Sequence, residues 1–212
     1  MAEPPRVKVC GVTLPEQARA CAEAGAWAIG VVLAEGSPRR VDAEGAARVL
    51  AAVPDGVARV GVFVGATPAE MAAVAARAGM THVQVHGGCD PDEVAAATGC
   101  RVIEAFSVSG PQDVERARAS AADLVLLDAA VRGLHGGTGR RFDWSILADT
   151  PPGRPFALAG GLTPDNVADA VAAVRPDVVD VASGVEARPG VKDLRAVALF
   201  IARARAAVAV AG

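Results

Sequence analysis

The sequence is poor in aromatic residues: it contains no tyrosine, and aromatic side chains make up only 3% of its 212 residues. Hydrophobic residues still reach 52%, so valine, alanine, leucine and isoleucine must fill the interior, as is typical of buried parallel strands. No apolar run approaches the roughly 18 to 20 residues of a membrane span, and the opening MAEPPRVKVCG lacks the apolar core of a signal peptide. We therefore expect a cytoplasmic protein that does not contact a membrane.

Charge and cysteine content argue against a nucleic-acid-binding protein, a disulfide-rich protein and a metalloprotein. The formal net charge is −3 and the arginines are scattered, which gives no general attraction for polyanions, so we expect no nucleic acid partner. The 4 cysteines form neither a C-x-x-C pair nor a His/Cys cluster with metal-ligand spacing. The sequence therefore predicts free thiols, no disulfide framework and no metal site.

Eight short apolar runs alternate with eight segments whose apolar residues recur at helical spacing. The predicted strands span residues 6–10, 28–33, 59–64, 82–85, 101–106, 123–128, 155–160 and 177–183. The predicted helices span residues 15–25, 43–53, 68–79, 91–98, 111–120, 143–149, 164–174 and 193–208. The pairs Thr67-Pro68, Asp90-Pro91 and Thr163-Pro164 are typical helix starts, and Gly79 and Gly99 follow helices.

Strands that alternate with helices indicate a parallel sheet, and eight units of this length fit one small (β/α)8 TIM barrel over residues 1–212. The alternative is an open doubly wound sheet. Against it, the first turn, CGVTLPE, has no G-x-G-x-x-G dinucleotide motif, and the chain has no G-x-x-x-x-G-K-[ST] phosphate loop. We therefore predict an α/β protein with a single barrel domain.

Polar residues occupy the carboxyl ends of several predicted strands, where barrels place their catalytic groups. Asp128 closes an apolar run, so its carboxyl is partly desolvated and suited to general acid or base catalysis. Cys10 ends the first strand, and its thiolate is able to take a proton from carbon. A helix cap or ion pair for Asp128, and a buried apolar role for Cys10, are the alternatives.

Other charged residues lie at or near strand ends. Lys8 points into the barrel and needs a carboxylate, for which Asp180 is a candidate; we interpret this pair as structural. Arg39 and Arg40 follow the second strand, where a guanidinium either clamps a carboxylate or stays solvated. His86 is placed over the barrel mouth, as a hydrogen-bond donor, a proton carrier or a structural residue.

Glycine-rich loops follow the seventh and eighth predicted strands: LAGGLTP at 158–164 and ASGVE at 182–186. Bare backbone N–H groups and a helix N-terminus favour an anion at this place in a barrel. The loops with Gly160, Gly161, Ser183 and Gly184 therefore indicate a phosphate site, unless the glycines serve only tight turns.

Nine segments, taken in order, resemble the phosphoribosylanthranilate isomerase family. They are KVCGVT at 8–13, SPR at 37–39, VGVFV at 60–64, VQVHG at 83–87, LLD at 126–128, GGTG at 136–139, FDW at 142–144, LAGGL at 158–162 and DVASGVE at 180–186. The match runs from about residue 6 to residue 202, and the combination of K-x-C-G, G-T-G-x-x-F-D-W and S-G-V-E is specific.

The resemblance implies a cofactor-free Amadori rearrangement in tryptophan biosynthesis, which turns the small phosphorylated aminosugar N-(5-phosphoribosyl)anthranilate into 1-(2-carboxyphenylamino)-1-deoxyribulose 5-phosphate. It implies that Asp128 is the acid that protonates the ring oxygen and that Cys10 is the base that removes the C2 proton. The implied binding residues are Arg39 for the anthranilate carboxylate, Gly137, Gly160, Gly161, Ser183 and Gly184 for the phosphate, and His86 and Asp180 as pocket lining.

The sequence departs from the family pattern at Arg40 and Ala182, and neither change removes a catalytic group. The related histidine-pathway aminoaldose isomerase typically has aspartate in place of Cys10 and halves that resemble each other, and here the glycine loops follow only strands seven and eight. That activity, dual activity, and a non-catalytic barrel that binds a phosphorylated ligand remain the alternatives. The expected assembly is a monomer or a homodimer.

Overall fold

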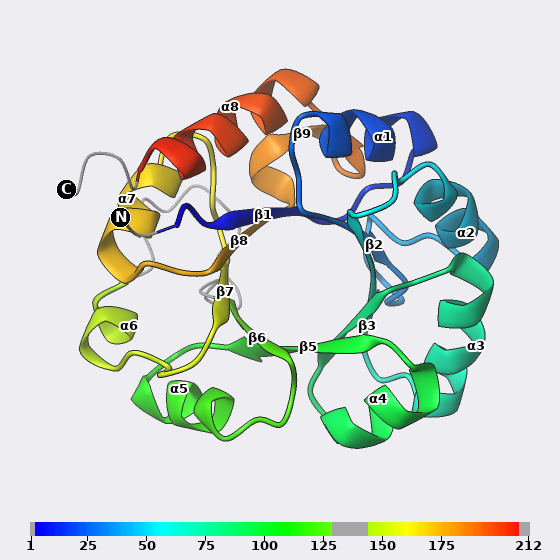
Figure 1. The fold of residues 1–212 in the computed structure, drawn as a ribbon, viewed down its shortest axis with the longest axis horizontal. Helices are drawn as coiled ribbons and strands as arrows, with labels where there is room; N and C mark the ends of the chain where they lie inside the picture. Colours follow the sequence, from blue (N-terminus) through cyan, green and yellow to red (C-terminus); the bar gives the residue numbers. More distant parts are fainter. Residues whose placement is uncertain (1–2, 129–143, 208–212) are drawn as a thin grey trace.

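The computed structural model describes residues 3–128 and 144–207. Eight parallel strands form a closed barrel in sequence order, with β8 (Val178–Val181) paired to β1 (Arg6–Val9). Helices surround the barrel on its outside (Figure 1). The predicted (β/α)8 architecture is confirmed; that the whole chain, 1–212, is one domain stays a prediction.

The strand and helix boundaries follow the sequence pattern closely. The remaining barrel strands are β2 (Ala28–Val32), β3 (Ala58–Phe63), β4 (His82–His86), β5 (Arg101–Ser107), β6 (Leu124–Asp128) and β7 (Phe156–Ala159). The helices are α1 (Pro15–Glu23), α2 (Ala43–Ala51), α3 (Pro68–Ala78), α4 (Pro91–Thr98), α5 (Pro111–Arg118), α6 (Ser145–Asp149), α7 (Val167–Val174) and α8 (Leu194–Ala206). A short 3-10 helix, η1 (Ser183–Val185), and a hairpin of β9 (Glu186–Arg188) and β10 (Val191–Lys192) follow β8, and the sequence did not predict them.

Local capping explains where the helices begin and end. Thr67 and Glu70 form a capping box at the start of α3, and Gly79 and Gly99 end α3 and α4 in the left-handed conformation. The predicted start of α7 at Pro164 is wrong, because α7 begins three residues later. Thr163 donates its N–H to Asn166 Oδ1 at 2.8 Å, so a turn precedes the helix.

The core has two parts. The larger part lies between the outer face of the strands and the helices. The smaller part fills the barrel with short side chains, which are Ala28, Ala58, Val60, Ile103, Ala105, Leu124, Leu126, Ala157, Ala159 and Val178. Three buried polar residues, Lys8, Gln84 and Asp180, lie on inward-facing strand positions, so the barrel interior is not purely apolar.

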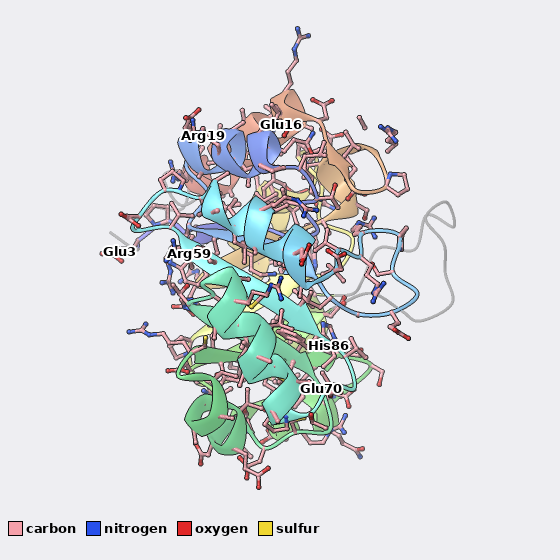
Figure 2. The ribbon with its side chains drawn as sticks, turned by 90° about the vertical axis from the view of Figure 1, so that its right-hand side faces the viewer. Glu3, Glu16, Arg19, Arg59, Glu70 and His86 are labelled. Carbon is pink, nitrogen blue, oxygen red and sulfur yellow. The ribbon has the colours of Figure 1, made fainter. Side chains whose placement is uncertain are left out.

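The two ends of the barrel differ in character. Glu3 and Arg59, near the starts of strands, lie at one end and His86 at the other (Figure 2). At the first end the Arg6 guanidinium lies 4.2 Å from the Trp27 ring, which packs edge-on against His82. His82 therefore lies at the end of the barrel opposite the strand carboxyl termini. Within residues 3–128 and 144–207, no helix has the length and apolar character to cross a bilayer.

Candidate active site

Cys10 and Asp128 lie at the carboxyl ends of strands on opposite sides of the barrel (Figure 1). Cys10 follows β1 directly, and its backbone N–H donates to the Val181 carbonyl at 2.8 Å, which extends the pairing of β1 with β8. Asp128 is the last residue of β6, in register with Ser107 and Ala159. The predicted acid and base thus face the same barrel mouth from opposite walls.

Cys10 is 8% exposed and lies next to the buried ion pair of Lys8 and Asp180. Burial raises the pKa of this thiol above its ordinary value, and the nearby Lys8 cation opposes the shift without cancelling it. A bare thiolate is therefore uncommon at neutral pH, but the thiolate that does form is a strong base. Gly30 on β2 makes room for the sulfur, because a Cβ there would lie 3.0 Å from Sγ.

Lys8 and Asp180 form the ion pair that the sequence suggested, one layer below Cys10. The Lys8 ammonium lies 3.0 Å from both carboxylate oxygens of Asp180, and the two residues are register partners on β1 and β8. Burial is the largest influence on the pKa of Lys8 and lowers it, but the charges and hydrogen bonds of Asp180 and Cys10 together outweigh burial and raise that pKa. The pair keeps a cation next to Cys10.

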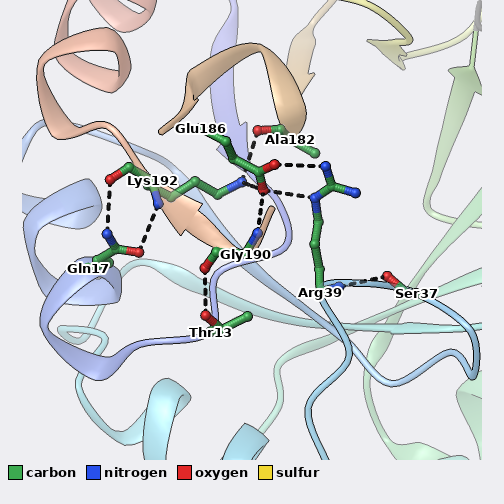
Figure 3. A network of polar contacts seen from close by, with 8 residues as sticks. All are labelled: Thr13, Gln17, Ser37, Arg39, Ala182, Glu186, Gly190 and Lys192. Atoms are coloured by element: carbon green, nitrogen blue, oxygen red, sulfur yellow. Dashed lines mark hydrogen bonds and ion pairs between the residues drawn. The ribbon is translucent and has the colours of Figure 1, made fainter. Parts of the chain in front are cut away.

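Arg39, in the loop after β2, is already paired with a carboxylate. Its Nε lies 2.8 Å from Oε1 of Glu186, and its Nη2 lies 2.7 Å from Oε2 (Figure 3). The Glu186 side chain is 4% exposed and the Arg39 side chain 21% exposed. Burial alone would raise the pKa of Glu186, but hydrogen bonds from Arg39 and Lys192 lower it overall, so this carboxylate stays ionised.

Lys192, on β10, connects this pair to the loop after β8. Its Nζ donates to Glu186 Oε1 and to the Ala182 carbonyl, each at 2.9 Å, and its side chain is fully buried. The side-chain amide of Gln17, on α1, donates from Nε2 to the Lys192 carbonyl at 2.9 Å and accepts at Oε1 from the Lys192 N–H at 3.0 Å. The network in Figure 3 thus spans α1, the β2–α2 loop and the β9–β10 hairpin.

Two glycine-rich loops approach each other after β7 and β8. Gly160 and Gly161 adopt positive φ angles of 97° and 63°, which favour glycine. Gly184 lies against the Leu162 backbone, so that a Cβ at Gly184 would overlap the Leu162 carbonyl. Ser183 and Gly184 belong to η1. The loops that the sequence predicted for phosphate therefore share one side of the barrel mouth.

The structure also describes the surroundings of His86 and Arg40, two further residues that the sequence analysis singled out. His86 ends β4, and its Nε2 lies 3.1 Å from the amide nitrogen of buried Gln84. Arg40 is 48% exposed and 3.8 Å from Glu35, in line with a solvated arginine. Gly137 lies outside the described residues.

Sequence reasoning missed Glu186 and Lys192 as parts of the site. Glu186 belongs to the S-G-V-E segment, but no role followed from its position. Its partner Arg39 is 147 residues away, so only the closed barrel brings the two together. An acid within a motif that otherwise contains only small and apolar residues was the one signal in the sequence.

Comparison with known proteins identifies the family of this chain. The model of the N-(5'-phosphoribosyl)anthranilate (PRA) isomerase family matches residues 7–203. The chain belongs to the PRA isomerase family. A curated relative, the N-(5'-phosphoribosyl)anthranilate isomerase of Acidithiobacillus ferrooxidans, is 45% identical over 202 residues, which cover 94% of this chain and 97% of the relative.

Solved structures of PRA isomerases agree with the barrel. The phosphoribosyl anthranilate isomerase of Thermotoga maritima superposes with a TM-score of 0.84 at 40% identity and covers 94% of this chain and 98% of its own. Another such isomerase, in complex with reduced 1-(o-carboxyphenylamino)-1-deoxyribulose 5-phosphate, gives a TM-score of 0.80 at 39% identity, with the same coverage of both chains. The family resemblance and the isomerase class predicted from the sequence are confirmed.

Proposed function

We propose that this chain converts N-(5-phosphoribosyl)anthranilate into 1-(2-carboxyphenylamino)-1-deoxyribulose 5-phosphate in tryptophan biosynthesis, with Asp128 as general acid and Cys10 as general base. Family membership over residues 7–203 supports the reaction. The observation that supports the residue assignment is the placement of one acid and one thiol at opposite walls of the same mouth. The small phosphorylated aminosugar would lie between them.

The proposed reaction begins when Asp128 gives a proton to the ring oxygen of the ribose. The bond from C1 to that oxygen breaks, and the anthranilate nitrogen supplies the electron pair that forms a C1=N iminium. The Cys10 thiolate then removes the proton from C2, which gives an enolamine. C1 then gains a proton while the C2 hydroxyl loses one, which gives the ketose, so the overall reaction is an isomerisation that needs no oxidant, reductant or cofactor.

The raised pKa of Cys10 suits the second step. A proton next to an iminium is only moderately acidic, and a thiolate whose conjugate acid is weak is a better base. The cost is a small thiolate population at neutral pH, and the Lys8 cation limits that cost because it stabilises the thiolate. Asp180 supports Cys10 indirectly, since it holds Lys8 in place.

Binding follows from the groups around the mouth. We assign the anthranilate carboxylate to the Arg39 guanidinium. The phosphate is assigned to the backbone around Gly160, Gly161, Ser183 and Gly184, with Gly137 as a further contact, and His86 and Asp180 line the pocket. The close approach of Gly184 to Leu162 supports a single anion site formed by both loops.

The deciding experiment follows the loss of N-(5-phosphoribosyl)anthranilate fluorescence, with the substrate made in situ from anthranilate and phosphoribosyl pyrophosphate. Wild type is compared with Cys10→Ala and Asp128→Asn, and each change should abolish turnover. Active variants would move the catalytic residues elsewhere. An inactive, folded wild type would favour the histidine-pathway substrate or a binding role.

We further propose that the protein acts in the cytoplasm as a monomer or a homodimer. The four cysteines, unpaired in the structure, suit a reducing compartment. Light scattering on the purified protein would separate the two assemblies.

A further inference from the structure

The network around Arg39 contains two buried groups to which the proposed reaction gives no task. The side chains of Glu186 and Lys192 are 4% and 0% exposed, whereas that of Arg39 is 21% exposed. A buried ion pair costs desolvation energy and is by itself poor support for stability. Glu186 contacts Arg39 directly and Lys192 contacts Glu186, which suggests that the two groups act on Arg39.

The bonds between Arg39 and Glu186 leave part of the guanidinium for a ligand. A guanidinium has five N–H donors, and Glu186 takes one from Nε and one from Nη2. Among the residues that the structure describes, the guanidinium donates to no other side chain. The edge formed by Nη1 and the second hydrogen of Nη2 therefore keeps the geometry that a second carboxylate accepts in bidentate fashion.

Glu186 is itself held in place from several directions. Its Oε1 accepts from Arg39 Nε at 2.8 Å, from Lys192 Nζ at 2.9 Å and from the Gly190 N–H at 3.3 Å. Thr13 donates to the Gly190 carbonyl at 2.6 Å and fixes the turn of the hairpin. The Glu186 carboxylate therefore has little conformational freedom, and its two hydrogen bonds restrict the Arg39 guanidinium in turn.

Lys192 links the same carboxylate to the glycine loop after β8 through the Ala182 carbonyl. The loop that follows Ala182 contains Ser183 and Gly184, to which we assigned the phosphate. One buried carboxylate and one buried ammonium thus connect the two ends of the proposed substrate site, and with both cations protonated the network carries one net positive charge.

We propose that Glu186, supported by Lys192, is a positioning residue that orients Arg39 for the carboxylate of the aminosugar's aromatic ring and so selects substrates that carry this group. This inference rests on the proposed function. Glu186 does not touch the substrate; it fixes the free edge of the guanidinium toward the mouth. Preorganisation of this kind improves binding because less rotamer entropy is lost when the ligand arrives.

Charge and orientation give opposite expectations for Glu186→Gln. Loss of the negative charge raises the net charge of the network, so attraction alone would tighten the binding of a carboxylate. If Glu186 acts by orienting Arg39, the same change weakens binding, because the guanidinium loses its bidentate partner. The sign of the effect therefore separates the two roles.

The test uses two stable ligands, reduced 1-(2-carboxyphenylamino)-1-deoxyribulose 5-phosphate and its counterpart without the carboxylate. Calorimetry gives their Kd values for wild type and Glu186→Gln. We expect Glu186→Gln to weaken the first ligand roughly 10- to 100-fold, the range for a lost bond to a charged group, and to leave the second almost unchanged. In kinetics KM should rise and kcat should change little.

Controls guard against a general loss of structure. Glu44→Gln removes a carboxylate from an exposed arginine pair at 2.6 Å and should change neither Kd. If Glu186→Gln alone does not fold, Glu186→Gln with Lys192→Met removes one buried charge of each sign. Both ligands share the phosphate near Ala182, so the ratio of their two Kd values is compared, and it should show the same loss of preference for the carboxylated ligand. An unchanged or improved preference for the carboxylated ligand would overturn the inference. A wild type without turnover would instead refute the proposed function.

Discussion

Removal of the carboxylate of Asp180 should destabilise the barrel strongly. The Lys8 ammonium lies 3.0 Å from both Asp180 oxygens, and the two side chains are 1% and 9% exposed. In Asp180→Asn the shape is kept, but a positive charge remains in the barrel interior without its counter-charge. The Asn amide then offers one acceptor where the carboxylate offered two charged ones.

The size of the effect follows from burial. Breaking a buried ion pair by changing one partner costs about 3–5 kcal/mol. For a domain of this length each kcal/mol lowers Tm by roughly 2–4 °C, so we expect a drop of roughly 6–20 °C. Lys8→Met combined with Asp180→Asn should recover most of this loss, because no uncompensated charge remains.

The assay is urea unfolding of wild type, the two single variants and the double variant, with Arg77→Met as an exposed control. The Arg77 pair with Glu44 has side chains that are 58% and 65% exposed, so its loss should cost at most about 1 kcal/mol. A cost for Asp180→Asn as small as that of the control would refute the reasoning from burial.

The pH dependence of the stability of Asp180→Asn tests whether Lys8 carries an uncompensated positive charge in this variant. Without Asp180, burial lowers the pKa of Lys8 below that of the unfolded chain. The unfolded state then binds more protons than the folded state between these two pKa values, so stability rises with pH in that window. The deficit of the variant should shrink as pH increases toward 10, and a deficit that grows would contradict a charged, uncompensated Lys8.

Three further predictions concern activity. Because burial raises the pKa of Cys10, the rate at which iodoacetamide inactivates the enzyme should rise about tenfold per pH unit between pH 7 and 9; a rate that does not change with pH would contradict a raised thiol pKa. Gly184→Ala should raise KM, because its Cβ would push the Leu162 carbonyl away, whereas Gly56→Ala, at a φ of 85° with open space around it, should lower Tm and leave KM unchanged. Arg39→Ala should weaken substrate binding roughly 10- to 100-fold by loss of a charged hydrogen bond, and Arg40→Ala should not; equal losses in a titration of both variants would remove Arg39 from the site.

The sequence by itself determined the local elements. Apolar periodicity sets the strands and helices, because a strand must bury every residue between two layers and a helix only one face. The cap at Thr67 and the helix ends at Gly79 and Gly99 followed from side chains a few residues apart. The predicted start of α7 was wrong because Asn166 Oδ1 accepts a hydrogen bond from the Thr163 N–H, which forms a turn before the helix begins.

The sequence also predicted that Cys10 and Asp128 lie at the same mouth. Both follow or end predicted strands, and a parallel barrel has all its strand carboxyl ends on one face. The Lys8–Asp180 pair could also be predicted, because the two-residue period of a strand points Lys8 inward, although the partners are 172 residues apart. Only the tertiary structure decided that Arg39 is held by Glu186 and that Lys192 joins them to Ala182. Those bonds depend on a hairpin after β8 folding back over the β2–α2 loop, and no short-range pattern encodes that contact.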